Sequence, residues 1–382
     1  SDQVPEILDF NILSSQRIPA VEKALQSTAV TLAVLQEAHV VDAGALGFSE
    51  FIKGFTAYLA APHPIDISAI HLPEVDTHHE LPSGDKPPEE RYCTEILLTG
   101  EALHREQLTM DLEPFGDCIV SSGNSSLSRF HLHCNEPWHV FDLMRKQGTI
   151  SQAKAQDMLR QYQMAHENPF PIALIVDSSA DLPKALMDKY QVHVISLNMH
   201  LDDHHLLDRI CINPDTFYDE LATLKTYPKT SCPATGIIEE QIRHISAYYQ
   251  HVLVLPIAKA LSATHDAIIN ASRSFNNVHV LDTKSTSAGI GLLLDYAGQM
   301  MTEGLDIETI KTRLMAAIPK SKFLVYVHQF DSLIRSGRVN KFSAKIAQWA
   351  HSKPIITLDE SGKGMVCDKA FSETKALTKI IQ

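Results

Sequence analysis

Several features that define common protein classes are missing from this chain of 382 residues. No apolar run reaches the roughly 18 residues that a transmembrane helix needs, and no signal-type segment opens the chain. The six cysteines lie far apart, without a Cys-x-x-Cys pair, which disfavours a disulfide-stapled secreted domain and favours the reducing cytoplasm. A Gly-x-Ser-x-Gly elbow is also missing, so a serine hydrolase is disfavoured.

Positive charge is in short supply as well, because 33 Lys and Arg stand against 46 Asp and Glu, for a formal net charge of −13. This balance does not provide the basic surface that nucleic acids or anionic membranes attract, so neither is an expected partner. The length is enough for two or three domains. Ser1 opens the chain without a Met, and Gln382 closes it within a Lys-rich helical pattern, so we expect a fragment of a longer protein.

Residues 1–60 have the pattern of paired helices, and residues 61–90 have the composition of a linker. Apolar side chains recur at helical spacing from Ile18 to Ala38, and a second helical stretch runs from Phe48 to Leu59. Six prolines, together with acidic residues and histidines, fall within 61–90. We therefore expect a domain boundary in this linker.

Residues 91–168 and 171–382 carry two different mixtures of helix and strand. The first block alternates β-like runs with two helices, near Val140–Arg145 and Ser151–His166, which predicts a small α+β domain. The second block alternates apolar strands with amphipathic helices, which predicts an α/β fold with a doubly wound parallel sheet. Its expected strands are Ile172–Val176, Val192–Leu197, His251–Pro256, Val278–Asp282, Phe323–Val327 and Pro354–Leu358.

Two segments of the second block have the residues of an anion site. The strand that ends at Val176 is followed by acidic and hydroxyl residues, at the strand end where open α/β sheets bind ligands. The turn 229–233 offers two adjacent hydroxyls before a proline that fixes the backbone, which suits a carboxylate or a phosphate. These hydroxyls belong to Ser178, Thr230 and Ser231.

Two later turns add charge. The strand that ends at Pro256 leads into a turn with Lys259, and Ser262 is the expected N-cap of a helix whose N–H groups would favour an anion. Arg338 follows a glycine turn. Hydroxyls and an arginine at one sheet edge, beside an aliphatic interior, predict a small-anion site with an apolar cavity. Taken singly, each Ser or Thr is equally explained as a cap or turn residue, and Arg338 as a surface charge.

In this order, the four segments resemble the motifs of the DegV family of bacterial fatty acid-binding proteins. They read Asp177-Ser178-Ser179, Thr230-Ser231-Cys232-Pro233, Ile257 to Thr264, and Ser336-Gly337-Arg338-Val339. The resemblance implies a DegV-like domain over 171–382 that binds a long-chain fatty acid. The implied lipid-binding residues are Ser178, Thr230, Ser231, Lys259, Ser262 and Arg338.

The third motif departs from the family, because Ala258 and Lys259 replace its paired serines. Either Lys259 compensates with its charge or this part of the site has diverged. A His-containing segment of the family would follow Gln382, so the DegV-like domain is expected to be incomplete at its C-terminus.

Cys93, His131 and His133 form a candidate metal site. On a strand the two histidines point to the same face, and two imidazoles with one thiolate suit Zn(II). A core cysteine and two hydrogen-bonded histidines explain the same spacing. Residues 92–95, 112–118 and 131–137 resemble the middle domain of bacterial fatty acid kinase, which implies a metal-binding role for the three residues. Other histidine clusters are expected in solvated loops, at His78–His79 and His200–His205.

The segment Val40–Phe48 resembles the closing motif of the DhaL-type kinase domain, which dihydroxyacetone (glycerone) kinases share with fatty acid kinase. The resemblance implies that Asp42 and Gly44 border a nucleotide, whereas a glycine helix turn with Asp42 as N-cap explains the segment equally well. The loop that holds Mg and ATP in that family would precede this chain, so ATP and Mg are expected cofactors of the parent protein only.

The chain is thus expected to be part of a fusion, in which the end of a kinase domain and a kinase middle domain precede a DegV-like domain. The implied activity of the parent protein is the ATP-dependent phosphorylation of a fatty acid, while this chain alone binds lipid without catalysis. A non-catalytic lipid-binding or regulatory protein is the alternative. The oligomeric state is open, with a homodimer among the expected states.

Overall fold

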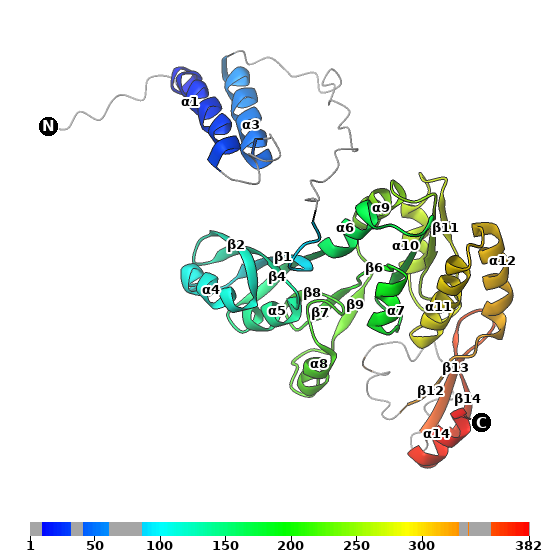
Figure 1. The fold of residues 1–382 in the computed structure, drawn as a ribbon. Helices are drawn as coiled ribbons and strands as arrows, with labels where there is room; N and C mark the ends of the chain where they lie inside the picture. The colour runs from blue at the N-terminus through cyan, green and yellow to red at the C-terminus, as the bar shows by residue number, and fades with distance from the viewer. Residues whose placement is uncertain (1–9, 32–40, 61–85, 328–334, 336–352, 382) are drawn as a thin grey trace. The chain divides into compact units, whose positions relative to one another are not determined.

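A computed structural model describes residues 10–31, 41–60, 86–327, 335 and 353–381. The chain divides into two compact units, residues 1–82 and 83–382, each of which is described by itself (Figure 1). Arg338 and the pair His78–His79 lie outside the described residues, as does most of the expected linker. Within the described residues, no helix has both the length and the apolar character needed to cross a membrane.

The described residues of the first unit form the helices α1 (Phe10–Thr31) and α3 (Ala43–Ala60), as the spacing predicted. The Asp42 backbone N–H donates to Thr28 Oγ1 at 2.9 Å, and Lys53 pairs with Glu22 at 3.1 Å. The first contact joins the residue before α3 to α1, and the second joins α3 itself to α1.

Residues 92–166 form an antiparallel four-stranded sheet with helices on one face. The strand order is β2-β3-β1-β4. Alternate residues of the two central strands are buried against α4 and α5, because successive strand residues point to opposite faces. The elements are β1 (Tyr92–Thr99), α4 (Arg105–Leu112), β2 (Gly116–Gly123), β3 (Leu127–Cys134), α5 (Pro137–Arg145), β4 (Thr149–Asp157) and α6 (Met158–His166).

The expected helix Ser151–His166 is wrong in its first half. Residues up to Asp157 extend β4, which pairs with β1 along its length. Helix α6 begins only after Asp157, whose Oδ1 accepts the Arg160 backbone N–H at 2.9 Å. Pairing with a central strand outweighs the local helical preference of this segment, since strand formation depends on neighbours that the local sequence does not contain.

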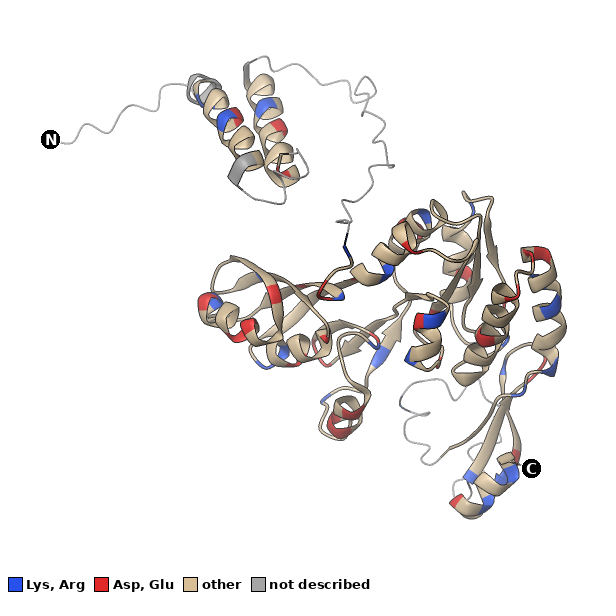
Figure 2. Ribbon diagram, in the orientation of Figure 1, with Lys and Arg blue, Asp and Glu red and all other residues tan. Residues whose placement is uncertain are grey.

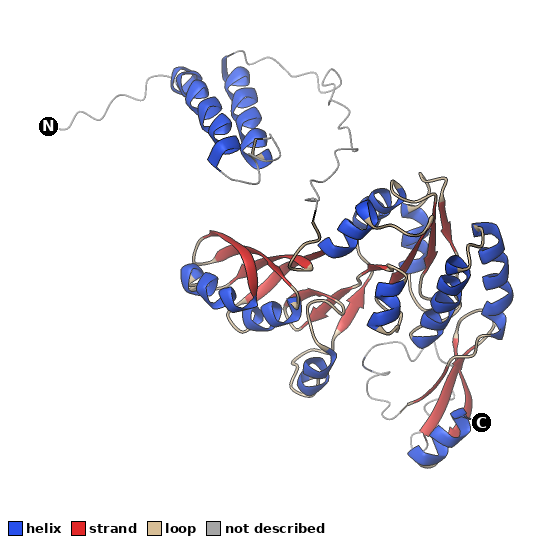
Figure 3. Cartoon of the chain, viewed as in Figure 1, coloured by secondary structure: helices blue, strands red, loops and turns tan. Residues whose placement is uncertain are grey.

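The second block contains a parallel sheet of four strands in the order β11-β10-β5-β6. The chain winds outward in both directions from the central pair, so the expected α/β class is confirmed. All six residues of β5 are buried because helices cover both faces (Figure 3). The strands are β5 (Ile172–Asp177), β6 (His193–Ile195), β10 (His251–Leu255) and β11 (Val278–Val280).

Two hydrophobic cores sandwich this sheet. One lies against α7 (Lys184–Lys189), α11 (Ala288–Thr302) and α12 (Ile307–Ala317). The other lies against α9 (Thr235–Ser246) and α10 (Thr264–Ala271). Both cores are mainly aliphatic, which matches the expected apolar interior.

The last two expected strands are not in the parallel sheet. They are β12 (Leu324–Tyr326) and β13 (Lys353–Leu358), which form an antiparallel sheet with β14 (Gly364–Ala370), followed by α14 (Glu373–Ile381). The tight turn after β13 makes β13 and β14 antiparallel, because a short hairpin can join only antiparallel neighbours. Both strands are apolar, as strands of a parallel sheet are, so their composition did not indicate that they belong to a different sheet.

A small antiparallel sheet, in the order β8-β7-β9, joins the two blocks of the second unit. It contains β7 (Asn198–Leu201), β8 (His204–Leu207) and β9 (Lys229–Ser231), so the expectation that His200–His205 form a solvated loop is wrong. Met199 and Leu206 reach the core of the middle domain, because the sequence alternates apolar residues with the histidines. Arg145 of α5 also forms a 2.6 Å ion pair with Glu220 of α8 (Pro214–Glu220).

Candidate functional site

The carboxyl ends of β5 and β10 lie side by side where the winding direction of the sheet reverses, which is the usual ligand position in such folds. Asp177 ends β5 and is fully buried. Its Oδ2 accepts the Ile257 backbone N–H at 2.6 Å, and its Oδ1 accepts the Ser179 backbone N–H at 2.9 Å. This carboxylate therefore shapes two of the four expected head-group segments.

Ser178 and Ser179 have different environments. Ser178 is 1% exposed, and its hydroxyl donates to Asp208 Oδ2 at 2.7 Å while it accepts the Leu197 backbone N–H at 3.1 Å. The Ser179 hydroxyl is buried and has no hydrogen-bond partner among the described residues. A buried hydroxyl without a partner is costly, so a ligand that accepts a hydrogen bond from Ser179 would remove that cost.

The loop that follows β11 closes the same edge of the sheet. The Ser287 backbone N–H donates to the Ser179 carbonyl at 3.0 Å, and the Asp181 N–H donates to the Ser287 carbonyl at 3.1 Å. Burial raises the pKa of Asp181, but hydrogen bonds from Ser287 and Arg209 outweigh it and hold that pKa below its usual range. Lys284 and Ser287 have φ of 49° and 53°, a conformation that residues other than glycine rarely adopt and that collects at functional loops.

Thr230 and Ser231 end β9. Because successive strand residues point to opposite faces, the two hydroxyls do not share a face. Ser231 Oγ lies 3.3 Å from His200 Nε2. The next residue, Cys232, has its thiol hydrogen-bonded to Thr264 at the start of α10, and burial raises its pKa.

Lys259 and Ser262 occupy the turn after β10. The Lys259 side chain is 61% exposed, with Nζ 4.0 Å from Asp282 Oδ2. The prediction of Ser262 as N-cap is wrong in position, because α10 begins at Thr264 and its N-cap is Ala263. Ser262 Oγ still accepts the Thr264 backbone N–H at 3.2 Å, so the hydroxyl stabilises the helix start from one residue further out.

The structure thus brings Ser178, Lys259 and Ser262 to the ends of two adjacent strands, while Thr230 and Ser231 lie on the neighbouring small sheet. The sequence prediction missed Ser179, although it belongs to the same Asp-Ser-Ser run as Ser178. Ser178 is paired by Asp208 and Leu197, which are distant in the sequence, so the sequence gives no sign of which of the two serines keeps an unpaired hydroxyl.

Cys93, His131 and His133 lie together on the exposed face of the middle sheet, as the strand spacing predicted. Their candidate ligand atoms are all within 4.8 Å of one another, with Cys93 Sγ 3.9 Å from His131 Nδ1. Burial, with a smaller contribution from Glu95, raises the pKa of Cys93. Burial and the neighbouring His133 lower the pKa of His131. One thiol and two imidazoles in this arrangement fit the ligand chemistry of zinc.

A second group of potential ligands shares His133. Asp117, Cys118 and His133 also lie within 4.8 Å of one another, and Asp117 Oδ1 is 3.7 Å from His133 Nδ1. A β-bulge between Asp117 and Val120 places Cys118 in this group, with φ of 51°.

Asp42 has a structural role in the first unit. Its Oδ1 accepts the Ala45 backbone N–H at 2.6 Å at the start of α3, and Gly44 lies beside the same oxygen. Neither metal-ligand group found within the described residues includes Asp42. A single carboxylate in a helix cap does not fit Mg and ATP, so no phosphoryl-transfer step follows from these two residues.

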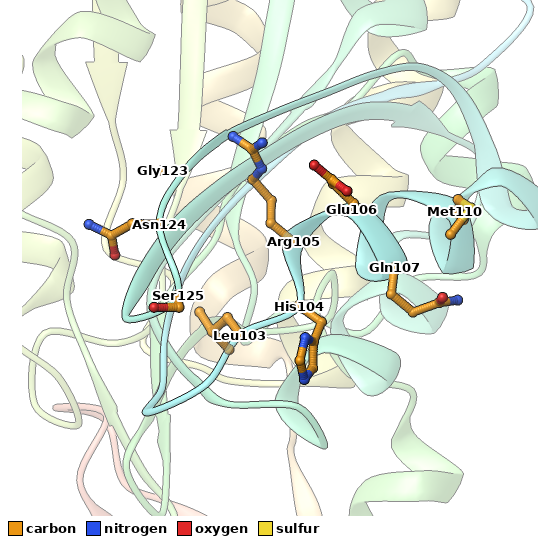
Figure 4. A pocket seen from close by; sticks show the side chains of 9 residues that line it. All are labelled: Leu103, His104, Arg105, Glu106, Gln107, Met110, Gly123, Asn124 and Ser125. Atoms are coloured by element: carbon orange, nitrogen blue, oxygen red, sulfur yellow. The ribbon is translucent and has the colours of Figure 1, made fainter.

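The described part of the second unit has an open hollow in the middle domain and another beside β9. The larger, about 700 Å³, lies between the start of α4 and the β2–β3 turn, where Asn124 is committed to hydrogen bonds with Ser126 and Leu127 (Figure 4). The smaller, about 480 Å³, lies beside β9 and is lined by His200, Asp202, Thr226, Tyr227, Lys229 and Arg335. Elsewhere, Asp and Glu are interspersed with Lys and Arg over the described helices (Figure 2).

Comparison with known families identifies both blocks of the second unit. Residues 171–382 match the family described as uncharacterised protein, DegV family, and residues 89–165 match the FakA-like middle domain of fatty acid kinase. Because the DegV match spans more than half of the sequence, the chain belongs to the DegV family. The expected resemblance of both blocks is confirmed.

Individual relatives agree with this assignment. A DegV domain-containing protein of Clostridium acetobutylicum is 30% identical over 214 residues, which are 55% of this chain and 76% of the relative. A DegV family protein from Thermus thermophilus, described by its fatty acid binding, has 27% identity and a TM-score of 0.51 over 55% of this chain and 75% of its own. DegV of Bacillus subtilis, described as a fatty acid binding protein, shares the fold with a TM-score of 0.50 at 23% identity, over 56% of this chain and 76% of its own.

Proposed function

We propose that this chain binds a long-chain fatty acid, with the carboxylate at the edge of the parallel sheet where β5 and β10 end. The unpartnered, buried hydroxyl of Ser179 is the observation that carries this proposal, because it lies beside the Asp177 turn at the ligand position of the fold. The solved relative from Thermus thermophilus supports it, since that protein is described by its fatty acid binding.

The acyl chain supplies most of the binding free energy in this proposal. Each buried methylene contributes about 0.8 kcal/mol, so a chain of ~12 to 18 carbons gives on the order of 10 kcal/mol before the costs of binding. The head-group contacts then set the orientation, and the aliphatic cores beside the sheet offer the apolar surroundings.

Calorimetric titration of the chain with hexadecanoate and with hexadecanol tests this function. The two ligands share the chain length and differ in the carboxylate, so hexadecanoate should bind at least tenfold more tightly if charged hydrogen bonds hold its head group. Equal affinity for the acid and the alcohol, or no binding of either, would rule the proposal out.

We further propose that the protein works with a fatty acid kinase, because the middle domain of that kinase and the DegV domain are parts of one chain. The ATP-dependent step, the role of Asp42 and Gly44, the cytoplasmic location and the homodimer all stay predictions. The alternative is a non-catalytic lipid-binding or regulatory protein. Formation of an acyl phosphate from ATP and fatty acid by the parent protein distinguishes the two.

A metal site is a second proposed function, favoured by the close approach of Cys93, His131 and His133. These three side chains would hold zinc as ligands and leave a fourth position open, and the ion would then cross-link β1 to β3. Both strands are central in the middle sheet, so the role we propose is structural support of that domain.

A further inference from the structure

The two groups of potential metal ligands lie on either side of His133. This residue is on β3, where it faces Cys93 of β1 in one strand pairing and Asp117 of β2 in the other. Residues directly opposite each other in a sheet share one face, so the three side chains stand on the same surface. Because β3 lies between β1 and β2, His133 has potential ligands on both sides.

A bulge in β2 brings Cys118 to the same surface. The register shifts between Asp117 and Val120, so that β2 has one residue more than the facing stretch of β3. Asp117, Cys118 and Val120 are exposed, whereas Ile119 packs against the hydrophobic core. Successive strand residues ordinarily alternate between the two faces, so the bulge is what places two potential ligands next to each other.

The spacing of the ligand atoms is close to that of zinc complexes. Zinc bonds of about 2.0 to 2.3 Å at a tetrahedral centre separate two ligand atoms by about 3.3 to 3.8 Å. Cys93 Sγ lies 3.9 Å from His131 Nδ1 on one side, and Asp117 Oδ1 lies 3.7 Å from His133 Nδ1 on the other. Adjacent strands are about 4.8 Å apart, so two strand spacings separate Cys93 from Asp117, which favours a separate ion on each side of His133.

We propose that His133 bridges two zinc ions, with one ring nitrogen bound to each. The first is the proposed structural zinc, which Cys93 and His131 also hold. The second is held also by Asp117 and Cys118, which supply a carboxylate and a thiolate, two of the ligand types that zinc takes in proteins. The inference rests on the proposed zinc site of the middle domain.

Charge and exposure set the properties of the second ion. A ring that binds two ions through both nitrogens carries a negative charge, and with two thiolates and one carboxylate it balances the four positive charges of the pair. The second ion should bind after the first, because the first fixes the ring of His133. It should also bind more weakly and be lost on dialysis, since its other two ligands are exposed side chains.

Native mass spectrometry of the 382-residue chain, at free zinc sufficient to fill both positions, counts the bound ions. The unmodified chain should hold two ions, whereas Cys118→Ser and Asp117→Asn should each hold one and weaken the second step at least about tenfold. Both side chains are exposed, so neither variant should change the urea midpoint. Cys367→Ser, which removes another exposed thiol, is the matched control and should hold two ions.

Cobalt(II) in place of zinc tests the bridge itself. Two cobalt ions that share one imidazole ring couple magnetically, so the electron paramagnetic resonance signal per ion should fall when the second ion binds to the unmodified chain. In Cys118→Ser no such fall should occur. An undiminished signal with two ions bound would show that His133 does not bridge them and would overturn the proposal.

The outcomes separate the second ion from the first. A single ion in the unmodified chain and in both variants would refute the second position and leave the first intact. Two ions in either Cys118→Ser or Asp117→Asn would place the second ion elsewhere on the chain and would also refute the bridge. No zinc in the unmodified chain would refute the proposed zinc site and the bridge with it.

Discussion

The carboxylate of Asp177 accepts a hydrogen bond from the Ile257 backbone N–H at 2.6 Å, which joins the end of one central strand to the turn after its neighbour. The other carboxylate oxygen accepts the Ser179 backbone N–H at 2.9 Å. The two turns nearest to the proposed head group are therefore built on a single buried side chain. We therefore expect Asp177 to affect both the stability of the fold and the geometry of the proposed head-group site.

Replacing Asp177 with Ala should lower the free energy of unfolding by about 3 kcal/mol, since two buried N–H donors would lose their acceptor at about 1 to 3 kcal/mol each. Urea denaturation measures the change. Asp306→Ala is the matched control, because Asp306 caps α12 at an exposed position and its loss should cost only about 1 kcal/mol. Equal losses in the two variants would contradict the central role of Asp177.

Ser178→Ala and Ser179→Ala should separate stability from binding. The Ser178 hydroxyl bridges Asp208 and Leu197, so its removal should cost about 1 to 2 kcal/mol of stability. The Ser179 hydroxyl is buried without a partner among the described residues, so its removal should leave the urea midpoint unchanged or raise it, and should weaken hexadecanoate about tenfold. A Ser179→Ala variant with full affinity would remove Ser179 from the proposed site.

The buried His193 predicts a loss of stability in mild acid. Burial, aided by Arg160 and His244, lowers the pKa of His193 from 6.5 to about 3. Below pH 6.5 the unfolded chain therefore binds a proton that the folded chain does not, and stability falls until the pH reaches the folded pKa.

The slope for one such proton is about 1.4 kcal/mol per pH unit, which gives about 2 kcal/mol between pH 6.5 and 5. The contribution of His193 is isolated by comparing the unmodified chain with His193→Gln. The urea midpoint of each protein is measured at pH 6.5 and at pH 5. The difference between the two proteins should shrink toward pH 5. A difference that stays constant with pH would show that His193 binds protons equally in the folded and the unfolded chain, and would refute the lowered pKa.

Cys93→Ser should abolish zinc binding, because it removes the only thiolate of the proposed ligand set. Metal analysis of the dialysed protein gives the zinc content directly. Cys367→Ser is the control, since Cys367 is exposed and lies in β14, and it should retain the metal. Zinc retained by Cys93→Ser, or absent from the unmodified chain after zinc addition, would refute the site.

Sequence patterns predicted those parts of the fold that depend on local burial. The unbroken apolar run of β5 indicates a strand covered on both faces, and such strands occur almost only in parallel sheets between helices. The segment 151–157 was misjudged because its strand depends on pairing with β1. The partners of β12 and β13 were misjudged because composition does not distinguish a parallel from an antiparallel strand.

The candidate site was predictable in its chemistry and less so in its detail. The strand spacing of His131 and His133 sufficed to place both on one face, since alternation is a property of every strand. The different environments of Ser178 and Ser179 depend on Asp208 and Leu197, which are distant in the sequence. His200 and Lys229 likewise lie opposite each other only once β7 and β9 pair.

Native mass spectrometry of the purified chain, before and after addition of hexadecanoate, tests the central claim most directly. The account predicts a complex heavier than the chain by the mass of one long-chain fatty acid, which disappears on denaturation and is depleted in Ser179→Ala. A chain that retains its own mass at saturating hexadecanoate would contradict the proposal that this DegV family member binds fatty acid.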